Sequence, residues 1–139
     1  MDLTEALEHA AAQHQGVLVT AKRDGRPQLS NIAYHLGDGL VRISITADRA
    51  KYANAVRDPK VSLYVGRQDF GAYVVLEGDA EVTPPAEATD DDTVDALVDL
   101  YRSLAGEHPD WDDYRRAMVT DRRAVLSFRP THAYGMWAS

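Results

Sequence analysis

The sequence of 139 residues is long enough for one domain, and we expect residues 1–139 to form a single one. Its 22 Asp and Glu outnumber its 15 Lys and Arg, and the net charge of −7 argues against a general nucleic-acid coat, which needs clustered positive charge. The absence of cysteine excludes disulfides, cysteine-ligated zinc, iron–sulfur clusters and a thiol nucleophile.

Membrane and export signals are also missing from the sequence. No apolar run approaches the roughly 20 residues that a membrane-spanning helix needs. The segment 1–15 is acidic and amphipathic, whereas a signal peptide has a basic start followed by an apolar stretch. We therefore expect a soluble cytoplasmic protein that binds neither membranes nor nucleic acid.

The first half of the chain predicts a helix followed by a meander of strands. Apolar residues recur at helical spacing over 3–14, with Asp2 or Thr4 available as the N-cap. Asp24-Gly25 is typical of a hairpin turn, because tight turns between strands need positive φ. The expected elements are a helix over 3–14 and strands over 17–21, 27–36 and 40–46.

The second half adds longer helices to further strands. Asp48 is suited to cap a helix over 49–58, which Pro59 ends. A long strand is expected over 72–83, with Gly78 as a bulge or bend. The remaining expected elements are strands over 60–66, 124–128 and 132–136 and helices over 94–104 and 110–120.

These elements predict a mainly β fold with peripheral helices. Two-residue turns between neighbouring strands make the sheet mainly antiparallel. About seven strands in so short a chain favour a small barrel, since closure removes exposed strand edges.

No motif for covalent or metal chemistry accompanies this fold. The nucleophile elbow, the zinc-binding HExxH helix, the Rossmann loop and the P-loop are all missing from the sequence. The five histidines lack the regular spacing of metal ligands, so we expect no metal site. If the protein is an enzyme, its difficult chemistry belongs to a cofactor.

The strongest polar constellation surrounds the start of the helix at residue 49. Ser44 and Thr46 present two hydroxyls on one face of a strand, and Arg49 and Lys51 follow at the helix N-terminus, which attracts anions. Residues 20–67 contain nine Lys and Arg against four Asp, which favours an anion site here. The alternative is a solvated strand end on a chain whose charges are unevenly scattered.

The strand before this site has a second polar pattern. Gln28, Ser30 and Asn31 carry amides and a hydroxyl suited to hydrogen-bond the heteroatom edge of a planar ring. The alternative is the ordinary polar face of an antiparallel strand.

A family resemblance extends over most of the chain, from about Gly16 to Gly135. It is carried by DGRPQLSNIAYHL, VRISITADRAKYANAVRDPKVSLYV and YVVLEGDAEVT, and in the second half by DDDTV, LYR and DWDDYR. The chain resembles the pyridoxamine-phosphate-oxidase-like flavin and deazaflavin proteins, whose fold is the FMN-binding split β-barrel. Within them it looks most similar to the actinobacterial branch that binds coenzyme F420.

The resemblance implies a role for particular residues of this chain. Arg49 and Lys51 are expected to grip the cofactor phosphate. The family forms homodimers with two cofactor sites at the interface, so the strand around Tyr73 is expected to contribute to the partner's site. Lys22, within the basic stretch, is expected to hold the anionic tail of F420. The residues expected to line the ring and its sugar-like chain are Pro27, Gln28, Leu29, Ser30, Ser44, Ile45 and Thr46.

The C-terminal segment departs from the family pattern. The chain ends in THAYGMWAS, without the arginine pair that holds the substrate phosphate in true pyridoxamine phosphate oxidases. F420 is therefore favoured over FMN, and the expected function is a reductase that passes hydride from reduced F420 to an unsaturated organic substrate. The alternatives are an FMN-dependent oxidoreductase and a non-catalytic F420 carrier. Tyr73 and His132 are candidate proton donors, and the catalytic residue is unassigned.

Overall fold

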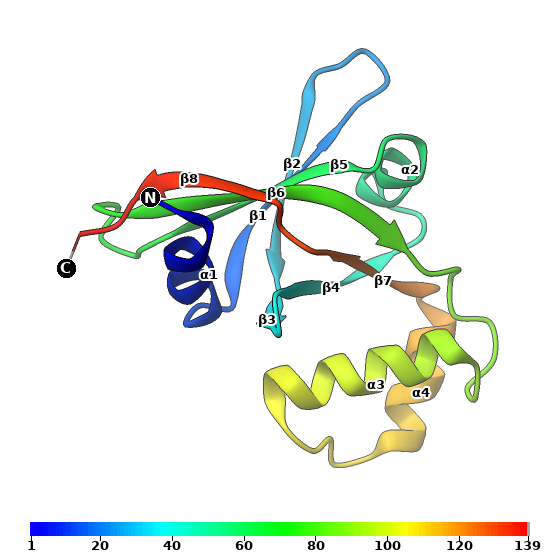
Figure 1. Ribbon diagram of the computed structural model, residues 1–139. Helices are drawn as coiled ribbons and strands as arrows, with labels where there is room; N and C mark the ends of the chain where they lie inside the picture. Colours follow the sequence, from blue (N-terminus) through cyan, green and yellow to red (C-terminus); the bar gives the residue numbers. More distant parts are fainter. Residues whose placement is uncertain (139) are drawn as a thin grey trace.

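The structure, a computed structural model, describes residues 1–138, so Ser139 of the expected domain lies outside the described residues. Within that range the chain forms four helices and eight strands (Figure 1). In chain order they are α1 (Leu3–Ala11), β1 (Gln15–Ala21), β2 (Pro27–Ala33), β3 (His35–Gly37), β4 (Leu40–Thr46), α2 (Ala50–Arg57), β5 (Lys60–Gly66), β6 (Tyr73–Val82), α3 (Asp92–Ala105), α4 (Trp111–Thr120), β7 (Arg123–Phe128) and β8 (His132–Met136). None of these helices is long and apolar enough to cross a membrane.

The strands form one antiparallel sheet that curls into a split barrel. Its order is β2-β1-β5-β6-β7-β4-β3, and β8 pairs with β6 outside this path. The two ends of the path, β2 and β3, are neighbours in the sequence but do not pair with each other. The predicted antiparallel split barrel with peripheral helices is therefore confirmed.

The strand predicted over 27–36 is broken in two at Tyr34, between β2 and β3. The ring of Tyr34 is fully buried, its hydroxyl donates to the Ala10 carbonyl at 2.6 Å, and its backbone N–H donates to the His14 carbonyl at 2.9 Å. The bond to His14 continues the β1–β2 register, in which Gln15 lies opposite Ala33, and directly after Tyr34 the chain changes its partner, because β3 pairs with β4.

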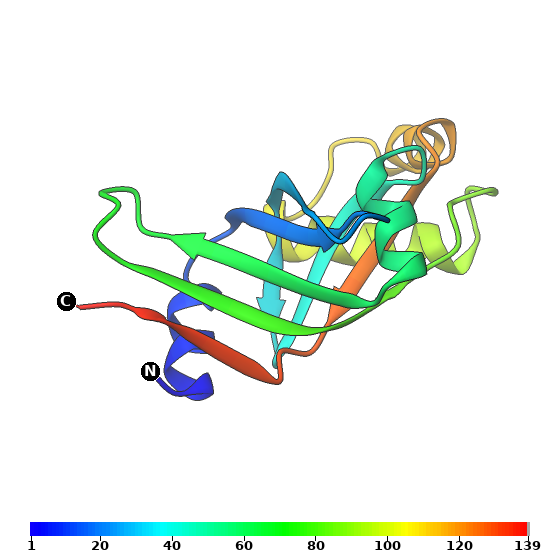
Figure 2. The same ribbon diagram turned by 90° about the horizontal axis from the view of Figure 1, so that it is seen from above.

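The bulge considered at Gly78 is not formed. The β5–β6 register runs from Lys60 opposite Asp79 to Gly66 opposite Tyr73 with no extra residue. The other edge of β6 changes partner at this point, from β8 to β7. Gly78 therefore lies where β6 changes its neighbour from β8 to β7. Figure 2 shows β6 as a long, curved strand.

The helices pack against the barrel at separate places. In both views α1 lies well apart from the α3–α4 pair (Figures 1 and 2). Ala6 and Ala10 of α1 and Ala55 of α2 are buried in the barrel core. The helices α3 and α4 pack on β7 and form a second small core, whose members include Val94, Leu97 and Val125.

Candidate cofactor site

The helix α2 begins one residue later than the sequence suggests, at Ala50. Its N-cap is Arg49, whose side chain makes no capping hydrogen bond, so the predicted Asp48 cap is wrong. A turn closed by the Arg49 N–H and the Thr46 carbonyl at 3.1 Å separates Asp48 from the helix. The first N–H groups of α2 therefore lack a side-chain acceptor, which leaves the positive end of the helix dipole available to an anion.

Two cavities adjoin at this helix start. The first, which we call the Lys51 groove, has a volume of about 380 Å³ and lies between β2, β4, α2, β7 and the α3–α4 pair. The second, the Arg49 cavity, has a volume of about 410 Å³. The groove is lined by Asn31, Ile32, Ala33, Ser44, Lys51, Leu100, Tyr101, Leu104, Tyr114 and Arg123, and the cavity by Thr46, Asp48, Arg49, Thr120, Asp121, Arg122 and Arg123.

Arg123 is shared by both cavities. It is the first residue of β7 and lies opposite Thr46 in the β4–β7 ladder. Its Nη1 donates to the Ser44 hydroxyl at 3.4 Å, while its buried Nε has no hydrogen-bond partner within residues 1–138. A buried N–H without an acceptor is costly, so this guanidinium is suited to receive an anionic ligand.

Three cations gather here without acidic partners. Within residues 1–138, none of Arg49, Lys51 and Arg123 forms an ion pair with a carboxylate. Burial, with the positive charges of Arg49 and Arg123 as further causes, lowers the pKa of Lys51. A bound anion would offset this repulsion and raise that pKa again, because an opposite charge favours the ammonium form.

The family follows from comparison with known proteins. The profile of the family described as pyridoxamine 5'-phosphate oxidase matches residues 3–137. The chain belongs to this family. Three similar solved structures are the conserved hypothetical protein Rv2991 from Mycobacterium tuberculosis (22% identity, TM-score 0.75, 98% of this chain and 84% of that one), an F420 reductase (22%, 0.68, 91% and 94%) and a FAD-binding protein from Mesorhizobium loti (19%, 0.70, 100% and 96%). At these identities the likeness is one of fold.

In this member of the pyridoxamine 5'-phosphate oxidase family, four of the expected polar residues lie around Arg123. Ser44 and Lys51 line the Lys51 groove, and Thr46 and Arg49 line the adjoining cavity. Ile45, between the two hydroxyl residues, points the other way and is buried in the barrel core. Only the backbone of Ile45 is therefore available to a ligand.

The expected ring-lining residues of β2 are divided between its two faces. Gln28 and Ser30 lie opposite the buried Thr20 and Leu18 of β1, so they share the inner face. Pro27 and Leu29 lie on the opposite face, which we call the outer face of the sheet. It is the face of β2, β1, β5, β6 and β8 that points away from the core. The groove itself is reached by the next residues of β2, Asn31 to Ala33.

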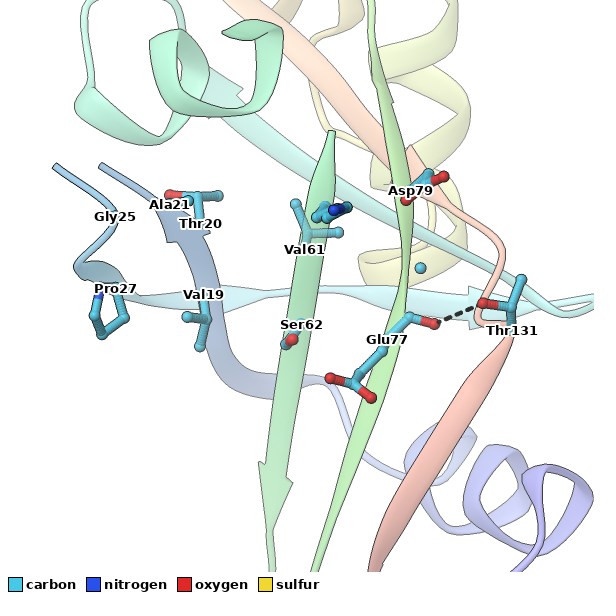
Figure 3. A pocket seen from close by; sticks show the side chains of 12 residues that line it. Val19, Thr20, Ala21, Gly25, Pro27, Val61, Ser62, Glu77, Asp79 and Thr131 are labelled. Carbon is cyan, nitrogen blue, oxygen red and sulfur yellow. Dashed lines mark hydrogen bonds between the residues drawn. The ribbon is translucent and has the colours of Figure 1, made fainter. Parts of the chain in front are cut away.

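A separate cavity of about 430 Å³ lies on the outer face. Figure 3 shows Pro27, Val19, Ser62 and Glu77 around it, and the Thr131 hydroxyl donates to the Glu77 carbonyl at 3.5 Å. It contains Pro27 but none of the three clustered cations, so the structure does not bring Pro27 together with the anion site of the same chain.

Two further expected residues lie away from the groove. Tyr73 is on the outer face, where its ring stacks on Tyr64 with centroids 5.6 Å apart. Lys22 is exposed in the turn between β1 and β2, and that hairpin projects away from α3 and α4 (Figure 1). Their roles toward a ligand stay predictions.

Sequence reasoning missed Arg123 and the wall formed by α3 and α4. The pair Arg122-Arg123 directly before the strand predicted over 124–128 was a visible signal of positive charge. Placing it beside Thr46 required the β4–β7 register, which joins residues far apart in the chain.

Proposed function

We propose that this chain is an oxidoreductase that binds coenzyme F420 and passes hydride from the reduced deazaflavin to an unsaturated organic substrate. The observation that carries this proposal is the cluster of Arg49, Lys51 and Arg123, which has no acidic partner among the described residues 1–138 and includes a buried N–H without an acceptor there. A phosphate group matches this cluster in charge and in hydrogen-bonding capacity. Membership of the pyridoxamine 5'-phosphate oxidase family makes a phosphate-bearing flavin or deazaflavin the natural ligand.

Different residues of the groove would bind different parts of the cofactor. Lys51 and Arg123 would hold the phosphate, and the Ser44 hydroxyl would add a hydrogen bond. Asn31, on the edge strand β2, would hydrogen-bond the heteroatoms of the ring, and the apolar side chains of α3 would exclude water. The cofactor supplies the hydride chemistry, and the protein supplies orientation and electrostatics.

F420 is favoured over FMN on charge. It carries a phosphodiester and a glutamate tail, so it is the more anionic of the two, and the chain places nine basic residues within 20–67. A solved structure that shares this fold is an F420 reductase. The second candidate is an FMN-dependent oxidoreductase. It is supported by the solved structure of a FAD-binding protein, a flavoprotein with the same fold.

The cofactor preference is tested by replacing Lys22 and Arg26 together with Gln. We expect this change to weaken F420 binding, more so at low salt, and to leave FMN binding nearly unchanged, because exposed contacts with the tail are screened over about 8 Å at physiological ionic strength. Fluorescence titrations of F420 and FMN at low and high salt measure both effects.

Arg116→Gln with Arg129→Gln is the matched control, since it removes two positive charges outside 20–67. A tighter complex with FMN than with F420 in the wild type would contradict the deazaflavin assignment. Equal losses for both cofactors in the Lys22 and Arg26 variant would also contradict it. Steady-state oxidation of reduced F420 with a panel of unsaturated substrates then separates a reductase from a carrier.

We also propose that the chain is a homodimer joined through the outer face. This face carries exposed apolar side chains, among them Leu29 (59% exposed), Tyr134 (47%) and Met136 (66%). Contiguous exposed apolar surface marks interaction sites. In a two-fold dimer joined through this face, Tyr73 and His132 would lie at the interface, as proton donation from either residue to the partner's cofactor would require.

Replacing Tyr134 with Lys is expected to convert the dimer to a monomer, because the new ammonium group would have to be buried against the partner. Light scattering at micromolar concentration measures the change. Val56→Lys on α2 is the control, since Val56 is also an exposed apolar residue (63%) but lies outside the outer face, and this variant should stay dimeric. A monomeric wild type with intact cofactor binding would overturn the dimer proposal.

A further inference from the structure

An aromatic cluster stands beside the cations of the Lys51 groove. Tyr101 of α3 and Tyr114 of α4 line the groove, together with Leu100 and Leu104. Behind them, Trp111 stacks on Tyr114 with centroids 5.6 Å apart and planes inclined by 21°. One wall of the groove is therefore apolar and aromatic, while its cationic end holds Lys51 and Arg123.

Tyr101 differs from its neighbours in what it leaves exposed. Its contacts with Tyr114, His108 and Trp111 are all edge-on, with planes inclined by 62°, 64° and 82°. No ring among residues 1–138 stacks on it face to face. Tyr101 is half-buried, whereas Tyr114 is buried and donates its hydroxyl to the Leu97 carbonyl at 3.2 Å. The buried Tyr114 therefore has a structural role. The half-buried Tyr101 has exposed ring surface, which is available to a ligand.

The aromatic wall is held rigidly in place. Glu107 accepts hydrogen bonds from Trp111 Nε1 at 3.3 Å and from Arg102 Nε at 2.8 Å, and the Arg102 guanidinium lies 4.7 Å from the centre of the Trp111 ring. The whole helix is tied to the barrel, because Arg42 of β4 donates to Asp99 at 2.7 Å and to Ser103 at 2.9 Å. Tyr101 is thus fixed relative to the cations across the groove.

We propose that Tyr101 is the ring-binding residue of the groove and stacks on a flat unsaturated ring of the same ligand whose anionic group is held by Lys51 and Arg123. The inference rests on the proposed function, which supplies the anionic group. Three observations support it: the groove lining contains two cations and no carboxylate, its opposite wall is aromatic, and both belong to one cavity of about 380 Å³. A ligand that combines a phosphate with a planar heteroaromatic ring satisfies both walls at once.

The test compares ring-bearing with ringless ligands. Calorimetric titrations with F420, FMN and inorganic phosphate are made on the wild type and on the variants Tyr101→Leu and Tyr101→Phe. We expect Tyr101→Leu to bind both F420 and FMN about tenfold more weakly, and inorganic phosphate as the wild type does, because aromatic stacking contributes this much to affinity. Tyr101→Phe keeps the ring and should keep the affinity. Phe70→Leu is the control, since Phe70 is exposed and lines none of the three cavities described above.

The absorption spectrum of the bound cofactor gives a second measurement. Stacking on Tyr101 shifts the long-wavelength band of the ring, and the shift should persist in Tyr101→Phe and vanish in Tyr101→Leu. If Tyr101→Leu fails to fold, an unshifted band in the wild type and in Tyr101→Phe overturns the inference. Wild-type affinity for F420 and FMN in a folded Tyr101→Leu overturns the inference and leaves the proposed function standing. A wild type that binds neither cofactor overturns both.

Discussion

The Arg123→Gln variant is expected to bind F420 and FMN about 10- to 100-fold more weakly than the wild type. The range is that of a lost hydrogen bond to a charged group. Both cofactors should lose equally, because each presents a phosphate to this site and Arg123 lines both cavities. Lys51→Ala should show a loss of similar size, since its ammonium lies in the same groove.

The Arg123→Gln substitution should not lower the stability of the ligand-free protein. Arg123 has no acidic partner in the part of the chain that the structure describes, and its charge is one of the causes that lower the pKa of Lys51. Removing it relieves repulsion among three cations, so the ligand-free variant should unfold at the same denaturant concentration as the wild type or a higher one. Urea unfolding with and without cofactor, alongside the titrations, separates the two effects. Arg129→Gln, away from the groove, is the control. Unchanged affinity in Arg123→Gln would move the phosphate site elsewhere.

The Gly78→Ala variant is expected to lose about 1–3 kcal/mol of the free energy of unfolding, the usual cost of an added methyl in a fully packed site. A Cβ at this position would lie 2.7 Å from the Arg129 carbonyl oxygen and 2.9 Å from Phe128 Cδ2. Backbone cannot move aside as the end of a flexible side chain can. The contact exists because the chain crosses closely over β6 between β7 and β8, where the Thr131 N–H donates to the Glu77 carbonyl at 2.8 Å.

Gly71→Ala is the matched control for Gly78→Ala. Gly71 lies in the exposed turn before β6, and a Cβ there would meet only the ends of the Arg67 and Asp69 side chains, which can move. Surface substitutions of this kind usually change stability by less than about 0.5 kcal/mol. Equal unfolding free energies for the two variants would show that the crossing over Gly78 is loosely packed.

Local patterns in the sequence determined most of the individual elements. Alternation of apolar residues identified strands such as 60–66, whose bounds are those of β5. The hairpin turn expected at Asp24-Gly25 lies between β1 and β2, and Gly25 has a φ of +87°. These features depend on residues close together in the chain, so the sequence was enough to predict them.

The errors occurred at the boundaries of elements, which neither capping chemistry nor apolar alternation decided correctly. Asp48 has the chemistry of an N-cap, but the turn from Thr46 to Arg49 moves the helix start past it. The alternation over 27–36 continues through Tyr34, but the chain changes its pairing partner there from β1 to β4, a strand partner that local alternation does not reveal.

The candidate site also combines residues that the sequence predicts with residues that only the tertiary structure places there. The sequence by itself determined the cationic helix start, because Ser44, Thr46, Arg49 and Lys51 are neighbours in the chain. Only the tertiary structure decided that Arg123 completes the cluster and that Tyr101 lines the same groove. Strand register and helix packing bring both residues there from distant parts of the sequence. Register and packing follow from the burial of the whole core, a property to which every element contributes and which no local segment encodes.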